Sequence, residues 1–173
     1  MAAVGVELVN VEDRARQVCL RSHIMVNQTK ALEVENSASK PLDSSMRSAI
    51  SRKFRELLKA GSDCAVLADY GYGLLADDLV QAMFSVAKGR DVETVSSIGL
   101  TPRTNLEKFS KSDIFSASES ELRACLHDYE SGLSVLVDRF YKSYDVKHIF
   151  LLLPDGGALF FRRPESLGRN MES

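Results

Sequence analysis

The sequence predicts an α/β fold in which a parallel or mixed central sheet is covered by helices on both faces. Two observations predict it. Short apolar runs alternate with longer segments whose apolar residues recur at helical spacing. Strands that alternate with helices in this way pair side by side in one sheet. The chain has 173 residues, 45% of them apolar and 27% charged, which is enough to bury the core of one domain.

The N-terminal part predicts a β-hairpin over residues 17–35. Two short alternating runs lie on either side of the polar turn sequence NQTK. The next stretch, residues 36–42, concentrates Ser, Asn and Pro and is typical of a loop. We treat the hairpin as an edge element that stands outside the α/β core.

The clearest predicted helix follows this loop and ends at Gly61, a residue that commonly terminates helices. Asp43, Ser44 or Ser45 can cap its first turn. Its apolar positions fall at helical spacing, namely Met46, Ile50, Phe54, Leu57 and Leu58.

The apolar run at residues 64–69 predicts a strand buried on both faces of a parallel sheet. A helix follows it, starting near residues 76–78 and ending at Gly89. Residues 99–112 are ambiguous. The remaining elements are predicted as strands at 92–98, 113–116, 148–153 and 158–162, helices at 119–127 and 133–144, and a tight turn at 154–157.

The predicted domain organisation is a single, partial domain over residues 1–173. The α/β core spans residues 43–162, and a polar tail spans residues 164–173. No secretory signal and no membrane-spanning run is present, so we expect a cytoplasmic protein.

Composition excludes several functions. The formal net charge is -2 and Trp is absent, which argues against nucleic acid and membrane surfaces as partners. The three cysteines, Cys19, Cys64 and Cys125, have no zinc or redox spacing, and we expect Cys64 and Cys125 to be buried. No Walker A loop is present.

The first candidate site is the loop Asp69-Tyr70-Gly71-Tyr72-Gly73, at the end of a predicted strand. Its glycines allow a sharp turn close to a ligand, and the N-terminus of the following helix suits a phosphate. The alternative is a plain turn with a capping aspartate, because a D-x-G-x-G loop is weak support for function.

The second candidate site is the segment Ser116 to Glu121, where a strand gives way to a helix. A carboxylate at Glu121 can orient a hydrated Mg²⁺, which needs few protein ligands. The alternative is a capping box, because Ser118 and Glu121 have the S-x-x-E spacing.

The order of these segments resembles the ribokinase-like (PfkB-type) carbohydrate kinases, and most closely the bacterial heptose-7-phosphate kinases. The loop at residues 69–73 is similar to their S-D-Y-G-K-G segment, and SHIMVNQTKALEVENSASKPL is similar to their R-x-I-x-x-N-Q-Q-x-L-R-x-D segment. Residues 116–121 are similar in position to T-P-N-x-x-E, and residues 146–160 to V-T-x-G-x-x-G. The resemblance spans residues 21–161.

The resemblance implies phosphoryl transfer from ATP to a sugar hydroxyl, at the carboxyl ends of the strands. It places Asp69, Gly71 and Gly73 in a loop that faces substrate and phosphates. It places Ser118 and Glu121 at the nucleotide, with Glu121 organising Mg²⁺ through water.

The sequence also departs from the family pattern. Tyr72 replaces the family's lysine, Ser118 replaces its asparagine, and Leu152 and Pro154 replace its Thr and Gly. The G-A-G-D motif that would carry the catalytic aspartate is expected after the final hairpin and is absent from this sequence. No catalytic residue is therefore assigned, and whether the chain is an enzyme stays open.

Three hypotheses remain from the sequence. The chain is part of a sugar kinase with ATP, Mg²⁺ and a sugar phosphate as ligands, and with a homodimer or a complementing kinase segment as partner. It is a non-catalytic remnant that acts as a binding or interaction module. Or it is an unrelated doubly wound domain.

Overall fold

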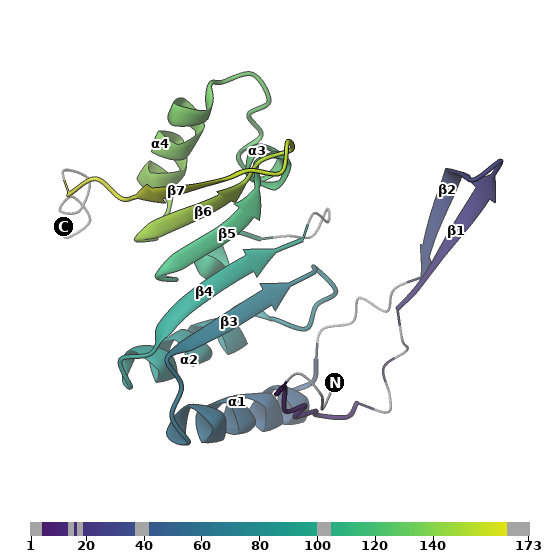
Figure 1. Cartoon of the computed structure of the whole chain (residues 1–173). Coiled ribbons are helices and arrows are strands. Elements are labelled where there is room, and N and C mark those ends of the chain that lie inside the picture. Colours follow the sequence, from purple (N-terminus) through teal and green to yellow (C-terminus); the bar gives the residue numbers. More distant parts are fainter. Residues whose placement is uncertain (1–4, 14–15, 17–18, 37–41, 100–104, 166–173) are drawn as a thin grey trace.

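The computed structural model describes residues 5–13, 16, 19–36, 42–99 and 105–165. These residues form a two-stranded sheet, β1-β2, and a five-stranded sheet, β3-β4-β5-β6-β7 (Figure 1). In chain order the elements are β1 Leu20–Val26, β2 Thr29–Asn36, α1 Ser44–Lys59, β3 Cys64–Asp69, α2 Asp77–Lys88, β4 Glu93–Ile98, η2 Glu107–Phe109, β5 Ile114–Ser118, α3 Glu119–Leu126, α4 Leu133–Ser143, β6 His148–Leu152 and β7 Ala158–Arg162.

The boundaries of the helices follow local signals in the sequence. Asp43 caps α1 by accepting a hydrogen bond from the Met46 amide at 2.8 Å. Gly61 follows the end of α1 with a φ of +101°, a conformation that glycine adopts without strain. The helices α2, α3 and α4 begin and end within about two residues of the expected positions.

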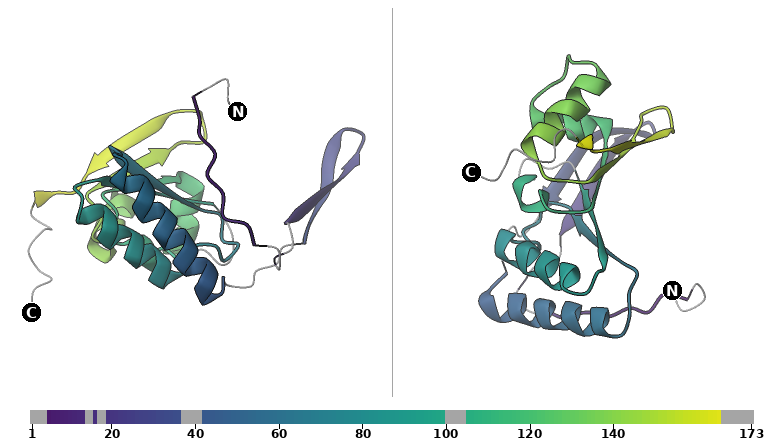
Figure 2. Two further views of the ribbon diagram at one scale, coloured as in Figure 1. Left: turned by 90° about the horizontal axis from the view of Figure 1, so that it is seen from below. Right: turned by 90° about the vertical axis from the view of Figure 1, so that its left-hand side faces the viewer.

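The five-stranded sheet has a simple topology, because its strand order is the order of the chain. Strands β3 to β6 are parallel, and β7 pairs antiparallel with β6 through the turn at residues 153–157. The β-α-β connections of such a sheet are right-handed, so successive crossovers in one direction place their helices on the same face. The predicted α/β fold with a mixed central sheet and packed helices is confirmed (Figure 2). The expected cover of helices on both faces is not found among the described residues, because the buried side chains of β3 to β6 all lie on one face.

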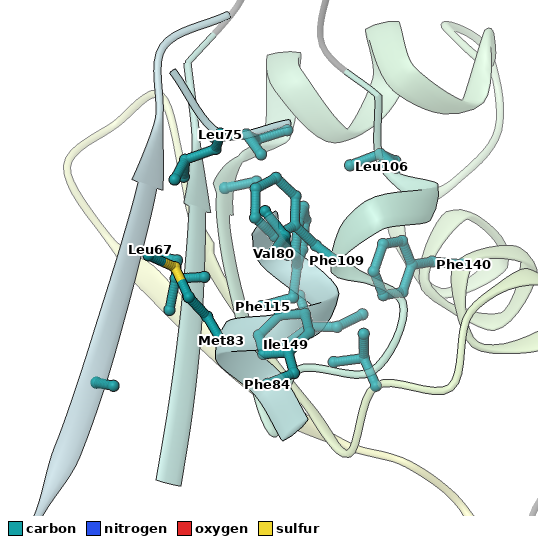
Figure 3. Close-up of a cluster of buried hydrophobic side chains, with 14 of the residues drawn as sticks. Leu67, Leu75, Val80, Met83, Phe84, Leu106, Phe109, Phe115, Phe140 and Ile149 are labelled. Carbon is teal, nitrogen blue, oxygen red and sulfur yellow. The ribbon is translucent and has the colours of Figure 1, made fainter. Parts of the chain in front are cut away.

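The core lies between that face of the sheet and the helices (Figure 3). Phe115 and Phe140 pack with ring centroids 5.0 Å apart, and Val80, Leu122 and Ile149 are fully buried. Packing against the sheet stabilises α2 and α4 more than helix propensity does.

Buried and accessible residues alternate strictly along β3, β4, β5 and β6. In β3, Ala65, Leu67 and Asp69 are buried, while Cys64 and Val66 are exposed. The prediction that residues 64–69 are buried on both faces is therefore wrong, as is the expected burial of Cys64. The physical reason is that the described residues cover only one face of the sheet, so every second side chain of β3 meets solvent.

The hairpin β1-β2 stands beyond the carboxyl ends of β3 and β4 (Figures 1 and 2). Its register pairs Ile24 with Leu32 and Arg21 with Glu35, and a bulge follows Ile24. One face is therefore apolar and the other charged. Nearly all of its residues are exposed, which is unusual because a lone hairpin is marginally stable.

Several expectations fall on residues outside the described part of the chain. They concern residues 17–18 at the start of the hairpin, 37–41 in the loop, and 166–173 in the tail; the ambiguous segment 99–112 includes residues 100–104. Within the described residues, none of the helices has the length and apolar character that a membrane span requires.

Candidate active site at the carboxyl edge of the sheet

The candidate residues gather at one edge of the sheet. The loop at residues 69–73 leaves the carboxyl end of β3, and the segment Ser118 to Glu121 follows the carboxyl end of β5. Strand β4 lies between β3 and β5, so the two segments belong to next-but-one strands rather than to neighbouring ones. Parallel strands are spaced by about 4.8 Å, which separates the two strand ends by roughly 10 Å.

The loop after β3 is built around two glycines in the left-handed region. Gly71 has a φ of +72° and Gly73 a φ of +75°, which L-residues with a Cβ rarely adopt. The Gly71 amide donates to Asp69 Oδ1 at 3.0 Å, and the Gly99 amide donates to the Asp69 carbonyl at 2.8 Å. These bonds turn the loop sharply back across the end of β4.

The Asp69 side chain does not face an open cleft. It is 2% exposed, and its Oδ2 atom lies 2.5 Å from Nζ of Lys108, which is itself 8% exposed. A buried carboxylate needs such a counter-charge. The Asp69 carboxylate is thus paired with Lys108 inside the protein, and Gly71 is buried as well. Tyr72 and Gly73 are partly accessible and form the outer part of the loop.

The N-terminus of α2 is also less suited to a phosphate than the sequence pattern indicated. Ala76 precedes it without a side-chain cap, and the first turn carries two carboxylates, Asp77 and Asp78. Asp78 accepts from the Leu79 amide at 2.9 Å and pairs with Arg47 at 3.1 Å. These carboxylates already complement the positive end of the helix dipole, so a phosphate there would meet like charge.

Ser118 and Glu121 form a complete capping box at the start of α3. The Glu121 amide donates to Ser118 Oγ at 3.2 Å, and Glu121 Oε2 accepts from the Ser118 amide at 2.7 Å. The capping alternative is thus confirmed. The cap uses only Oε2, so the carboxylate remains compatible with a role toward a hydrated metal ion.

Glu121 is the residue at this edge of the sheet that could help to bind Mg²⁺. Across the residues that the structure describes, no three His, Cys, Asp or Glu side chains cluster as metal ligands. Mg²⁺ commonly keeps several waters and takes one or two carboxylates together with substrate phosphates. A single carboxylate at the start of α3 therefore fits a nucleotide-bound Mg²⁺, and Asp69 does not, because Lys108 neutralises it.

Cys125 lies one helical turn after Glu121 in α3. It is partly buried rather than fully buried as expected, and burial, followed by the charge of Glu121, raises the pKa of its thiol to about 11. The thiol is therefore protonated at neutral pH, and Cys125 is no candidate nucleophile.

The hairpin reaches the loop through Tyr72. The Tyr72 hydroxyl donates to Glu35 Oε2 at 2.9 Å and accepts from Arg21 at 2.8 Å, and Arg21 also pairs with Glu35 at 2.9 Å. The bond to Glu35 is the main cause that raises the pKa of the Tyr72 phenol. Arg16 donates in addition to the Tyr72 carbonyl. The residue that replaces the family's lysine thus joins the hairpin to the loop.

A cavity lies at the opposite edge of the sheet. Its volume is about 800 Å³, and it is bordered by residues at the amino ends of β4, β5 and β6, among them Thr94, Asp113 and Lys147. Asp113 accepts from the Thr94 amide and hydroxyl and pairs with Lys147 at 2.5 Å. In open α/β sheets ligands bind at the carboxyl ends of strands, so we do not assign the site here.

The sequence analysis missed Lys108 and Arg21 as parts of this edge. Lys108 lies in the segment that the pattern left ambiguous, and Arg21 lies in a hairpin whose position relative to the core is not a local property. One signal could have pointed to Lys108: an acid at the end of an apolar strand, such as Asp69, requires a buried cation nearby.

Comparison with known proteins shows which solved structures share this architecture. No family model matches the chain. The structure of a ribokinase from Giardia lamblia superimposes with a TM-score of 0.69 over 96% of this chain and 51% of the other, at 11% identity. A carbohydrate kinase from Agrobacterium tumefaciens gives a TM-score of 0.53 over 86% of this chain and 45% of the other, at 14% identity. The chain has the ribokinase-like fold of carbohydrate kinases.

Weak sequence similarity points to a particular group within that fold. The bifunctional protein HldE of Helicobacter pylori is 24% identical over 157 residues, which is 88% of this chain and 33% of the relative. The resemblance to ribokinase-like kinases is thus confirmed by both comparisons. The chain spans about a third of the length of this curated relative and about half of each solved kinase.

Proposed function

We propose that the chain is part of an ATP-dependent sugar kinase that transfers a phosphoryl group to a hydroxyl of a heptose-phosphate-like sugar. Phosphoryl transfer depends on positioning and charge neutralisation more than on covalent chemistry. In this proposal Glu121 orients the Mg²⁺ of Mg-ATP through water, Ser118 borders the nucleotide, and Gly71 and Gly73 shape the loop next to the sugar.

The single observation that carries the proposal is the shared edge. The loop at residues 69–73 and the segment Ser118 to Glu121 both lie at the carboxyl ends of parallel strands, in a chain whose fold is that of carbohydrate kinases. This edge is the place where an open α/β sheet binds its ligands.

No described residue is assigned here as the catalytic base. We propose that a complementing kinase segment supplies it, because the solved kinases are about twice as long as the part that matches. The apolar face of the hairpin fits a homodimer contact, and the protein is proposed to act in the cytoplasm, where ATP and sugar phosphates are available.

The proposal is tested by replacing Glu121 with glutamine. Glutamine supports a capping box, so Glu121→Gln is expected to keep the melting temperature while removing the charge that orients Mg²⁺. Mg-ATP at about 100 times its Kd should raise the melting temperature of the unmodified chain by roughly 5–10 °C. The variant should lose most of that rise.

Two further variants complete this experiment. Glu130→Gln changes an exposed acid in the loop between α3 and α4 and should leave the Mg-ATP response intact. Glu121→Ala should lower the melting temperature itself, because it breaks the cap. An unchanged Mg-ATP response in Glu121→Gln would remove Glu121 from the nucleotide site.

The second candidate function is a non-catalytic ribokinase-like remnant that acts as a binding or interaction module. Specific observations favour it: Asp69 is neutralised by Lys108, and Asp77 and Asp78 occupy the N-terminus of α2. This function is supported if neither Mg-ATP nor a heptose phosphate shifts the melting temperature of the unmodified chain.

A further inference from the structure

Lys108 contacts both ends of the loop that follows β3. Its Nζ atom pairs with Asp69 Oδ2 at 2.5 Å and donates to the Leu75 carbonyl at 2.9 Å. Asp69 is the first residue of the loop, and Leu75 lies at its far end, two residues before the start of α2. One ammonium group therefore holds both ends of the loop.

The position of Lys108 is itself fixed by its surroundings. Its neighbours Leu106 and Phe109 are buried, and its carbonyl accepts from Gln81 Nε2 of α2 at 2.9 Å. Its ammonium lies 5.2 Å from the centre of the Phe109 ring, within the range of a cation–π contact. These contacts fix the short helix η2, and η2 in turn fixes the position of Lys108 next to the loop.

The loop depends on this cation for its shape. Asp69 uses Oδ1 to hold the Gly71 amide at 3.0 Å and Oδ2 to meet Lys108, so one carboxylate links the turn to the ion pair. Removal of Lys108 would leave a buried carboxylate without its counter-charge, and the loop would have to open to hydrate it.

We propose that Lys108 is a positioning residue for the loop at residues 69–75. By holding both ends of this loop, Lys108 sets the partly accessible Tyr72 and Gly73 toward the sugar phosphate and does not itself touch that ligand. This inference rests on the proposed function for its ligand, but the ordering of the loop can be measured without any ligand. It assigns Asp69 the role of an anchor for Lys108 rather than that of a ligand-binding carboxylate.

The first test is amide hydrogen exchange of Lys108→Met in the absence of ligand. The amides of residues 70–75 should exchange on the order of a hundredfold faster, because the uncompensated Asp69 favours the open loop. The amides of β5 and β6 should keep their protection. Lys111→Met, which changes an exposed lysine three residues away, should exchange like the unmodified chain.

The second test is binding at a temperature where the variant is fully folded. Lys108→Met should weaken the affinity for a heptose phosphate by about tenfold, with a smaller loss for Mg-ATP, because the nucleotide is proposed to bind near Glu121. The double variant Asp69→Asn with Lys108→Met should melt at a higher temperature than Lys108→Met, because it removes the buried unpaired charge.

Two outcomes would overturn the inference. One is unchanged exchange of residues 70–75 in Lys108→Met, and the other is equally faster exchange throughout the sheet, which would make Lys108 a general stabilising residue. If the unmodified chain binds neither ligand, the proposed function fails, while the exchange experiment still decides whether Lys108 orders the loop.

Discussion

Gly71 and Gly73 are required by backbone geometry rather than by packing. Both have positive φ angles, where a Cβ atom approaches the following carbonyl oxygen. The turn they form brings the loop back toward Gly99, where a Cβ would lie 3.1 Å from the Tyr70 ring. The glycines of the D-Y-G-Y-G pattern therefore have a structural role even where no ligand binds.

The substitution Gly71→Ala is expected to destabilise the chain by about 1–2 kcal/mol, the cost of a left-handed residue with a Cβ. Gly157→Ala is the matched control, because its Cβ would lie 3.6 Å from Leu153, an ordinary contact. The control should change the free energy of unfolding by less than about 0.5 kcal/mol. Urea denaturation measures both, and equal costs at the two sites would contradict this explanation.

At the scale of single residues, the sequence predicted caps well and ion pairs poorly. The Asp43 cap and the Ser118–Glu121 box follow from local spacing, because a cap involves residues only two or three positions apart. The pair of Asp69 and Lys108 joins positions 39 residues apart by sequence number, and no periodicity reports such a contact. The ion pair of Asp69 could therefore not be predicted from the sequence.

The hairpin is the element whose placement depends most on a few side chains. Its charged face carries Arg21, Glu33 and Glu35, and it meets the loop at the Tyr72 hydroxyl. Because nearly all hairpin residues are exposed, little apolar packing helps these polar contacts to hold the hairpin in place. The hairpin should therefore open and close more readily than the sheet.

The substitution Tyr72→Phe is expected to loosen the hairpin without unfolding the core, because it removes only the hydroxyl shared by Arg21 and Glu35. Hydrogen exchange of β1 and β2 should become faster, and exchange of β5 and β6 should not change. Tyr129→Phe, at an exposed tyrosine between α3 and α4, is the control. Unchanged hairpin exchange would show that the cluster does not hold the element.

The same contact has a defined pH dependence. The bond to Glu35 raises the pKa of the Tyr72 phenol above its ordinary value of 10.0. The hydrogen bond from the Tyr72 hydroxyl to Glu35 therefore stabilises the hairpin fully below about pH 10. This stabilisation is lost as the pH rises through the higher pKa that the phenol has in the folded state. The hairpin should be held throughout the neutral range.

At the scale of elements, the order of strands and helices was predictable from periodicity and turn residues. Strand β7 was predicted at the positions observed, and β6 differed by one residue. The exposure of one face of the sheet was not predictable, because the apolar run of β3 is the same whether one or both faces are covered.

The whole molecule exposes an apolar surface on the outer face of its sheet. Val66 is 66% exposed, Leu152 47% and Phe150 39%, and Phe160 of β7 lies directly opposite Phe150. Strand β3 also ends the five-stranded sheet, within the described residues, with no charged residue before Asp69. Such edges and faces favour association with another polypeptide.

We therefore expect the isolated chain to self-associate as its concentration rises, which sedimentation velocity measures directly. The double substitution Val66→Lys and Phe150→Lys should shift it toward the monomer, because it places charge on the outer face. Val135→Lys, on an exposed position of α4, should leave the association unchanged. A monodisperse monomer of the unmodified chain at high concentration would contradict the expectation.

The sheet that follows the order of the chain has a consequence for how the protein is made. Each of β4, β5, β6 and β7 hydrogen-bonds to the strand synthesised just before it. A nascent chain leaving the ribosome thus adds each strand to a neighbour that has already emerged, and it needs no later segment to fill a gap between them.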